Sequence, residues 1–294
     1  MNQHIVFIIN PVSGIGNKDK FLENVVQIDD WEGWSYEVSY TERAGHATEL
    51  ANEYSTKADY VIAVGGDGTV HEVAKGLVGT EAIFGIIPMG SGNGVARHLK
   101  IPVRVTKAIA MIKYSEVSKI DTLRINGDFL LGVGGAGFDA HVAHEFDKAP
   151  TRGLSTYAKL SLKEYFRFKP IDYEFEIDGK DVKGRAFLFA IANSSQWGND
   201  FFISPQSSMK GGKAKLIVVE EVDKARTVLL GPALLTRSVT RLTFVKSYDF
   251  TKLKFKLNSS VFHIDGEPST RIGEQLVEVV TDDLFVCTPK GVEV

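Results

Sequence analysis

The residues best suited to do chemistry lie in the stretch 64–73, whose sequence is VGGDGTVHEV. An apolar run (60–64) precedes the motif and an apolar periodic segment follows it, so we expect a strand, a turn and a helix. Adjacent glycines let the backbone of such a turn approach a ligand closely, and the free N–H groups at a helix start favour anions. The carboxylate of Asp67 would suit a Mg²⁺–phosphate ligand or proton removal from a hydroxyl there.

Two further loops of small residues, 10–17 and 88–94, also follow apolar runs. Neither contains the Gly-Lys-Ser/Thr of a Walker loop or the Gly-x-Gly-x-x-Gly of a dinucleotide fingerprint. Alone, the first loop is as compatible with an ordinary turn as with phosphate binding. Three such loops on neighbouring parallel strands together predict a phosphate or nucleotide site.

The elements that must position these loops alternate between strand and helix up to about residue 122. Apolar runs predict strands, and periodic segments predict helices. The expected strands are 5–9, 36–40, 60–64 and 83–87, and the expected helices are 18–28, 47–56 and the segment after Asp67. This alternation predicts an α/β domain with a parallel sheet, whose ligands bind at the carboxyl ends of the strands.

Strand patterns dominate from Asp121 onward and predict a second, mainly antiparallel domain with inserted helices near 155–168 and 224–241. The expected strands are 122–125, 129–132, 173–177, 186–192, 215–219, 253–257 and 277–280. We therefore expect domains at 1–122 and 123–284. A last strand (284–287) fits either domain, so the segment 285–294 is a candidate to complete the first.

Isolated residues carry weaker signals. Arg43 is compatible with phosphate binding, but a solvated loop charge is the commoner case, and the lone His71 favours packing or capping. The glycine-dense run 132–139 fits either a cleft lining or a bulged strand with close backbones. Glu267 follows a tight turn, as an exposed residue of a plain hairpin also would.

Composition limits the functional classes. The chain of 294 residues is 44% hydrophobic with a formal net charge of −3, which gives no reason to expect nucleic acid as a partner. Cys287 is the single cysteine, so an intrachain disulfide and a cysteine metal site are excluded. No apolar run approaches the ~20 residues of a membrane span, and the first residues lack a basic region. Residues 224–256 hold eight basic side chains against one acidic, which suits anionic lipid headgroups or a solvated surface equally.

Taken in order, five motifs resemble the diacylglycerol kinase catalytic family, which includes bacterial diacylglycerol kinases and the sphingosine and ceramide kinases. The motifs are Asn10-Pro11 with its loop, GGDGT at 65–69, GSGN at 90–93, GFDA at 137–140 and DGE at 265–267. The stretches 40–47, 70–73 and 90–93 are similar to the sphingosine-kinase branch.

The resemblance implies an ATP-binding first domain of the kind found in NAD kinases, a β-sandwich-like second domain that holds the lipid, and catalysis in the cleft between them. It implies that Asp67 orients the acceptor hydroxyl and takes its proton, or holds Mg²⁺ together with Glu267. Asp121, Asp139 and His141 would lie in or beside the substrate cleft. The implied ATP contacts are Asn10, Ser13, Gly14, Gly16, Thr41, Arg43, Gly65, Gly66, Gly68, Thr69, Gly90, Ser91 and Asn93.

Two positions depart from the family pattern. Bacterial diacylglycerol kinases carry Asp-Gly-x-Leu-Asp where this chain has Gly211 to Lys215, so both carboxylates of a structural Mg²⁺ site are missing and we predict that this site is absent. Gly94 stands where many bacterial members have Asp, which thins the expected carboxylate network.

These observations favour an ATP- and Mg²⁺-dependent lipid kinase acting on a diacylglycerol or sphingoid-type acceptor. We expect a cytoplasmic protein in peripheral contact with the inner membrane surface, able to form a homodimer and without a nucleic-acid partner. The alternatives are a soluble-substrate kinase of the NAD kinase type and a non-catalytic nucleotide- or lipid-binding protein.

Overall fold

The structure is a computed structural model that describes residues 3–12, 33–148, 154–177 and 179–292. The chain divides into two compact units, one formed by Met1–Asp121 with Thr281–Val294 and the other by Thr122–Val280. Two strands, β5 (Glu116–Ile125) and β15 (Glu274–Thr288), run from one unit into the other. The helix expected over 18–28 lies outside the described residues.

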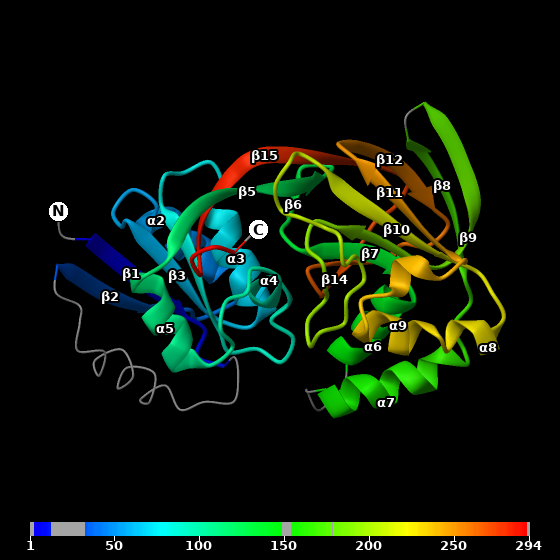
Figure 1. Ribbon diagram of the computed structural model, residues 1–294, viewed down its shortest axis with the longest axis horizontal. Coiled ribbons are helices and arrows are strands. Elements are labelled where there is room, and N and C mark those ends of the chain that lie inside the picture. Colours follow the sequence, from blue (N-terminus) through cyan, green and yellow to red (C-terminus); the bar gives the residue numbers. More distant parts are fainter. Residues whose placement is uncertain (1–2, 13–32, 149–153, 178, 293–294) are drawn as a thin grey trace. The chain divides into compact units, whose positions relative to one another are not determined.

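The first unit contains a parallel sheet in the order β2-β1-β3-β4, and the end of β15 joins it beside β4 (Figure 1). Its elements are β1 (Gln3–Ile9), β2 (Trp34–Tyr40), α2 (His46–Tyr54), β3 (Tyr60–Gly65), α3 (Asp67–Leu77), β4 (Ile83–Pro88), α4 (Gly94–His98) and α5 (Val105–Lys113). The expected strand–helix alternation is confirmed over these residues.

The parallel strands of the first unit are apolar because both faces of the sheet are covered. Residues Ile5 to Ile9 are almost completely buried in β1, which lies between β2 and β3. Helix α3 turns its predicted apolar stripe inward: Val70, Val73, Ala74 and Leu77 are all buried. This packing fixes the start of α3, and with it Asp67, at the end of β3.

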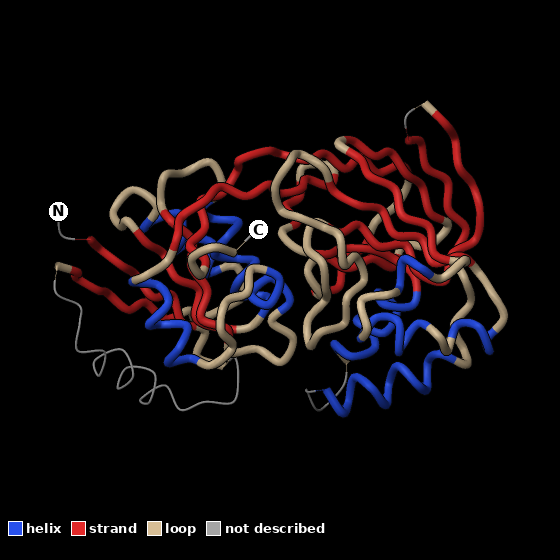
Figure 2. The backbone as a smooth tube through the Cα atoms, viewed as in Figure 1, coloured by secondary structure: helices blue, strands red, loops and turns tan. Residues whose placement is uncertain are grey.

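The second unit is mainly antiparallel, as its strand patterns predict. Figure 2 shows how much of this unit consists of strands. Its elements are β6 (Asp128–Leu130), β7 (Val133–Gly137), α6 (Phe138–Asp147), α7 (Leu154–Tyr165), β8 (Ile171–Ile177), β9 (Lys180–Ala192), β10 (Ala214–Glu220), α8 (Lys224–Thr227), α9 (Leu230–Leu235), a 3₁₀ turn (Val239–Arg241), β11 (Val245–Phe250), β12 (Lys252–Leu257), β13 (Val261–Ile264) and β14 (Glu267–Thr270). The predicted fold class, an α/β domain followed by an antiparallel β-rich domain, is confirmed.

The glycine-dense run after β6 is a regular buried strand, β7, and not a loop. A β-carbon on Gly135 would lie 2.4 Å from the carbonyl oxygen of Phe189 on the neighbouring β9. Glycine is therefore required by the close approach of two backbones, although β7 pairs with β9 in a continuous register, without the bulge that this reading of the sequence included.

The helices expected near 224–241 are present as α8, α9 and a 3₁₀ turn. One expectation about element boundaries was wrong. The two strands expected at 277–280 and 284–287 are one continuous strand, β15. Its last residues pair in parallel with β4, Val286 opposite Phe84, so the chain returns to the first unit.

Candidate functional site

The described start of the first loop (10–12) and the loops after β3 and β4 lie at one edge of the sheet of the first unit, because the strands that precede them are parallel neighbours. Backbone hydrogen bonds hold the loops together there. The N–H of Asn10 donates to the carbonyl oxygen of Val64 at 3.2 Å, and that of Met89 donates to the carbonyl oxygen of Gly65 at 2.8 Å. Asn10, Asp67 and the loop before α4 are thereby brought to the same edge.

Asp67 is the first residue of α3, and its carboxylate binds the start of a different helix. Its oxygens accept hydrogen bonds from the N–H of Asn93 at 2.9 Å and from the N–H of Gly94 at 2.8 Å. The carboxylate therefore caps α4 and fastens the loop after β3 to the loop after β4. A negative charge is favoured there because the first N–H groups of a helix lack partners within the helix.

Glycine is required where these two loops touch. A β-carbon on Gly90 would lie 2.6 Å from the Cα of Gly66, closer than real β-carbons approach backbone atoms. One on Gly65 would lie 2.5 Å from Oγ1 of the buried Thr69. The backbones of the two loops are therefore in direct contact at Gly66 and Gly90.

The side chain of Asn93 stabilises the loop after β4, in which it lies. Asn93 has a left-handed backbone conformation (φ 53°), and its side chain accepts a hydrogen bond from the N–H of Gly90 and donates one to the carbonyl of Gly90. Ser91, between the two, is exposed. The amide of Asn93 thus stabilises the loop, while the hydroxyl-bearing residue lies at its surface.

Glu72 is a residue of this site that the motifs in the sequence did not indicate. Its carboxylate accepts hydrogen bonds from the N–H groups of Gly45 and Ala47, at 2.9 and 3.1 Å, and so caps α2 as Asp67 caps α4. The five-residue spacing of two carboxylates on one helix was the available signal. Both carboxylates of α3 therefore organise neighbouring helix starts.

The other described residues of the first unit that are expected to contact ATP each bind a different partner. Thr41 is buried and donates its N–H to Ile9. Arg43 is exposed and pairs with Glu49 at 2.7 Å, and this hydrogen bond raises the pKa of Arg43 and lowers that of Glu49. The Oδ1 of Asn10 accepts the N–H of Val12 within its own loop. Ser13, Gly14 and Gly16 lie outside the described residues.

In the second unit, Glu267 begins β14 and is exposed. The turn before it has positive φ at both Asp265 (49°) and Gly266 (88°), as a tight hairpin turn requires. The carboxylate of Asp265 accepts hydrogen bonds from the N–H groups of Leu131, Gly132 and Val133 at 2.6–3.1 Å. The turn that carries Glu267 is therefore anchored to the chain between β6 and β7.

A buried pair supports the same turn. His263 Nε2 lies 3.0 Å from Oδ2 of Asp139, and both side chains are buried. The N–H of Gly266 donates to His263 Nδ1 at 3.3 Å, so Nε2 carries the proton and donates to Asp139. His263 is 124 residues away from Asp139 in sequence, and no local pattern could have predicted their pairing.

The other two residues expected near the substrate have different surroundings. Asp121 is buried and accepts the N–H of Asp282 at 3.0 Å, within the first unit. His141 binds the buried Glu164 at 3.0 Å, and this hydrogen bond lowers the pKa of Glu164. Asp121 and His141 thus each bind a partner in their own unit.

The position expected to lack a structural Mg²⁺ site carries a cation–anion pair. Lys215 on β10 binds Asp249, which is opposite to it on β11, and Gly211 lies in the preceding turn with φ 93°. The absence of that metal site stays a prediction.

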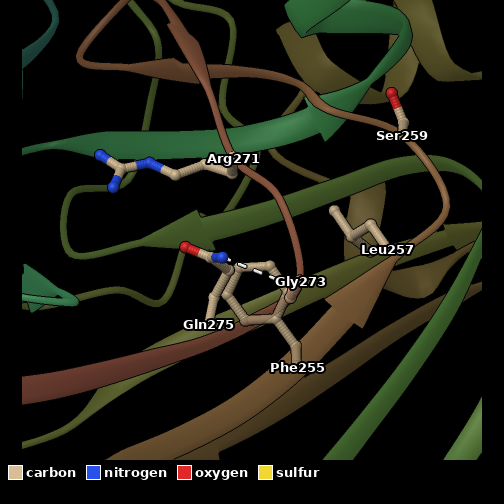
Figure 3. A pocket seen from close by; sticks show the side chains of 6 residues that line it. All are labelled: Phe255, Leu257, Ser259, Arg271, Gly273 and Gln275. Carbon is tan, nitrogen blue, oxygen red and sulfur yellow. Dashed lines mark hydrogen bonds between the residues drawn. The ribbon is translucent and has the colours of Figure 1, made fainter.

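A hollow in the second unit is lined by Phe255, Leu257, Ser259, Arg271, Gly273 and Gln275 (Figure 3). Its walls leave essentially no interior space for a water molecule. Gln275 donates to the carbonyls of Ile272 and Gly273 and accepts from Asn126. These bonds give Gln275 a structural role in joining the start of β15 to the hairpin after β5.

In the part of the chain that the structure describes, no helix is both long and apolar enough to cross a bilayer.

Comparison with known proteins gives matches along almost the whole chain. Residues 4–125 match the family "Diacylglycerol kinase catalytic domain", and residues 132–288 match the family "YegS C-terminal NAD kinase beta sandwich-like domain". The diacylglycerol kinase of Bacillus subtilis (strain 168) is 30% identical over 227 residues, which cover 75% of each chain. That of Staphylococcus haemolyticus is 28% identical over 299 residues, covering 97% of this chain and 88% of the relative.

Solved structures share the fold. A crystal structure of a diacylglycerol kinase from Bacillus anthracis strain Sterne covers 99% of this chain and 98% of its own, with a TM-score of 0.78 at 18% sequence identity.

Proposed function

The chain belongs to the diacylglycerol kinase catalytic-domain family, and from this membership we propose that it is an ATP- and Mg²⁺-dependent lipid kinase. It transfers the γ-phosphoryl group of ATP to a hydroxyl of a membrane lipid. Relatives named diacylglycerol kinase make diacylglycerol the first acceptor to test, and the motifs similar to the sphingosine-kinase branch make a sphingoid base the second.

The observation that carries this proposal is the fastening of the loops after β3 and β4 by Asp67. The carboxylate holds α4 by two N–H groups, and the backbones of Gly66 and Gly90 are in contact. Phosphoryl transfer requires above all positioning and charge stabilisation. Loops held in place at the carboxyl ends of parallel strands suit that requirement.

The residues present fit both cofactors. The loops after β3 and β4 are built from small residues, which lets a phosphate chain approach their backbone closely, and the exposed Ser91 adds a hydroxyl in the loop after β4. ATP supplies the phosphoryl group, and Mg²⁺ offsets its charge. Asp67 supplies carboxylate oxygens at this edge of the sheet, and carboxylate oxygen is a ligand that Mg²⁺ prefers.

Asp67 and Glu267 are the proposed catalytic residues. Asp67 orients the acceptor hydroxyl and receives its proton, or holds Mg²⁺ with Glu267. What supports a positioning role is that the Asp67 carboxylate is itself held in one orientation by two N–H donors. What supports a role for Glu267 is its exposed place directly after a turn anchored by Asp265.

The test is the transfer of labelled γ-phosphate from ATP·Mg²⁺ into chloroform-extractable product. The acceptors are diacylglycerol, monoacylglycerol, sphingosine, ceramide, phosphatidylglycerol and undecaprenol, and NAD in a separate aqueous assay. We expect labelled lipid with the native chain and loss of transfer by about 100-fold or more with Asp67→Asn. Labelled phosphate found in NAD and in no lipid would contradict the proposal and indicate a soluble-substrate kinase. ATP binding without transfer to any acceptor would contradict catalysis.

Asp67→Asn also weakens the cap of α4, since an amide nitrogen would face a backbone N–H. Glu72→Gln is the matched control because it weakens the equivalent cap of α2 from the same helix. We expect this control to keep most of the transfer activity at a similar loss of thermal stability. Equal loss of activity in both variants would assign Asp67 a purely structural role.

A further inference from the structure

Apolar side chains gather on one part of the surface of the second unit. Leu162 lies on α7 and Phe166 directly follows it, while Val228 and Leu229 join α8 to α9. All four side chains are between 52% and 66% exposed. Together with Leu235 on α9 they are five of the six large apolar side chains that the described part of this unit exposes, Ile272 being the sixth. Scattered single residues would need no explanation, but this concentration does.

The two segments that carry these side chains are in contact. Tyr165 donates its hydroxyl hydrogen to the carbonyl of Lys224 at 2.5 Å. Lys224 donates in turn to the carbonyl of Phe166 at 2.8 Å and lies 5.5 Å from the centre of its ring. Val228 follows Lys224 by one helical turn. Figure 1 shows α7 and α8 along the same side of the unit. Leu162, Phe166, Val228 and Leu229 therefore form one surface, the α7–α8 surface.

The exposed apolar side chains do not belong to the side of the helices that packs on the core. In α9, Leu230, Ala233 and Leu234 are buried in the core, and Tyr165 and Phe168 from the end of α7 pack against the same core. The segment 228–235 is thus apolar on both its inner and its outer side, whereas a helix facing water usually has a polar outer side.

Basic side chains surround the α7–α8 surface. The segments 162–169 and 223–237 contain six basic residues and two acidic ones in a chain whose formal net charge is −3. Both acidic residues are engaged: Glu164 is buried against His141, and Asp223 caps α8 by accepting the N–H of Arg226. The exposed basic residues are Lys163, Arg167, Lys169, Lys224, Arg226 and Arg237.

The basic character of residues 224–256 does not extend evenly along this stretch. Lys252 on β12 pairs with Glu278 at 2.8 Å, and Lys246 on β11 lies 4.0 Å from Glu220. In the helical part of the stretch, Arg226 lies 3.7 Å from Asp223, whereas Lys224 binds the carbonyl of Phe166 beside the exposed apolar side chains.

We propose that the α7–α8 surface binds the surface of an anionic phospholipid bilayer. Phe166, Leu162, Val228 and Leu229 enter the boundary between headgroups and acyl chains, and the surrounding lysines and arginines bind lipid phosphates. Apolar insertion combined with basic residues is the physical basis of interfacial binding. The inference rests on the proposed function for its purpose, which is to bring the enzyme to a membrane-bound acceptor, but binding itself is measurable without turnover.

The test is co-sedimentation with vesicles of phosphatidylcholine alone and with vesicles rich in phosphatidylglycerol. We expect the native chain to prefer the anionic vesicles, and the double variant Phe166→Ser, Leu229→Ser to lower the partition coefficient about tenfold or more. The matched control is Ile272→Ser, because Ile272 is 81% exposed and lies outside the surface. Circular dichroism melting curves confirm that each variant is folded.

A second pair of variants tests the charges. Lys169→Gln with Arg226→Gln is expected to weaken binding to anionic vesicles alone, whereas Lys254→Gln with Lys256→Gln, exposed on β12, is expected to leave it unchanged. Vesicle binding that is unaffected by all substitutions in the surface would overturn the proposal. So would a native dimer that the apolar double variant converts to monomer without any vesicle binding.

The outcomes separate this proposal from the proposed function. Surface-dependent vesicle binding by a chain that phosphorylates no lipid would retain the surface and reject the kinase. Lipid phosphorylation by a chain whose vesicle binding ignores these residues would retain the kinase and reject the surface.

Discussion

At the scale of single residues, carboxylates in this protein hold backbone N–H groups in place. Asp67 holds two, Glu72 holds two and Asp265 holds three. A charged acceptor makes stronger hydrogen bonds than a neutral one. Each carboxylate thereby fixes a loop or a helix start.

His263 offers a test of this arrangement in the second unit. His263→Leu removes the donor to the buried Asp139 and the acceptor of the Gly266 N–H. We expect a loss of about 1–3 kcal/mol in the free energy of unfolding, measured by urea titration. We also expect a lower kcat with an unchanged KM for ATP, because the turn before Glu267 loses a support.

His263→Gln is the conservative control, since an amide supplies both a donor and an acceptor. It should recover most of the lost stability and part of the kcat. If the Leu and Gln variants were equally active, His263 would have no part in positioning Glu267.

The sequence was enough to identify several residues of the candidate site but not the residues to which they form hydrogen bonds. Gly65, Gly66 and Asp67 stand next to one another, so a strand–turn–helix pattern was enough to identify them. Asp139 and His263 belong to elements far apart in the chain, and their pairing depends on how β7 and β13 lie side by side. Contacts of this kind follow from tertiary packing, which a local pattern does not contain.

At the scale of elements, helix α3 holds the neighbouring elements in place. Its apolar stripe packs on the sheet, while Asp67 and Glu72 cap α4 and α2. The parallel strands were predictable because burial on both faces demands continuous apolar runs. The bounds of the short helices within residues 224–241 were not predicted, because the apolar spacing there does not mark where each helix ends.

Helix α4 contains a buried histidine whose titration should affect stability. Burial, and to a lesser extent Lys100, lowers the pKa of His98 from 6.5 to about 4. The unfolded chain therefore binds this proton more readily than the folded chain. The free energy of unfolding therefore keeps its full value above about pH 6.5 and decreases as the pH falls toward 4, because protonation favours the unfolded chain over this range.

We expect this histidine to cost the protein about 2 kcal/mol of unfolding free energy at about pH 5, relative to neutral pH. The measurement compares urea unfolding of the native chain and of His98→Gln at both pH values. The native chain should lose about 2 kcal/mol more than the variant does over this interval. An identical pH dependence of the two proteins would refute the low pKa of His98.

At the scale of the whole molecule, the chain forms two units that share β15. The N-terminal end of this strand pairs with β12 in the second unit, and its C-terminal end pairs with β4 in the first. The sequence left open to which unit the last strand returns, because an apolar strand pattern does not name its neighbour. The burial of Leu284, Val286 and Cys287 results from their place in the sheet of the first unit.

Two Leu→Ala variants test whether the units unfold separately. Leu284 on β15 and Leu253 on β12 are both fully buried, one in each unit. Each substitution should cost about 2–5 kcal/mol. Native-state hydrogen exchange should show faster opening of β1 and β3 with Leu284→Ala, and of β9 and β10 with Leu253→Ala. Equal acceleration throughout the chain by either variant would mean that the two units unfold as one.

The path of β15 also sets an order of events during biosynthesis. The strand that covers β4 is made from residues 281–288, which leave the ribosome after all of the second unit has been translated. Until then the edge of β4 lacks its neighbour, and exposed strand edges invite pairing with other chains. The first unit would thus begin first and finish last. Nascent chains halted at residue 280 should therefore be more susceptible to aggregation and proteolysis in the first unit than full-length chains.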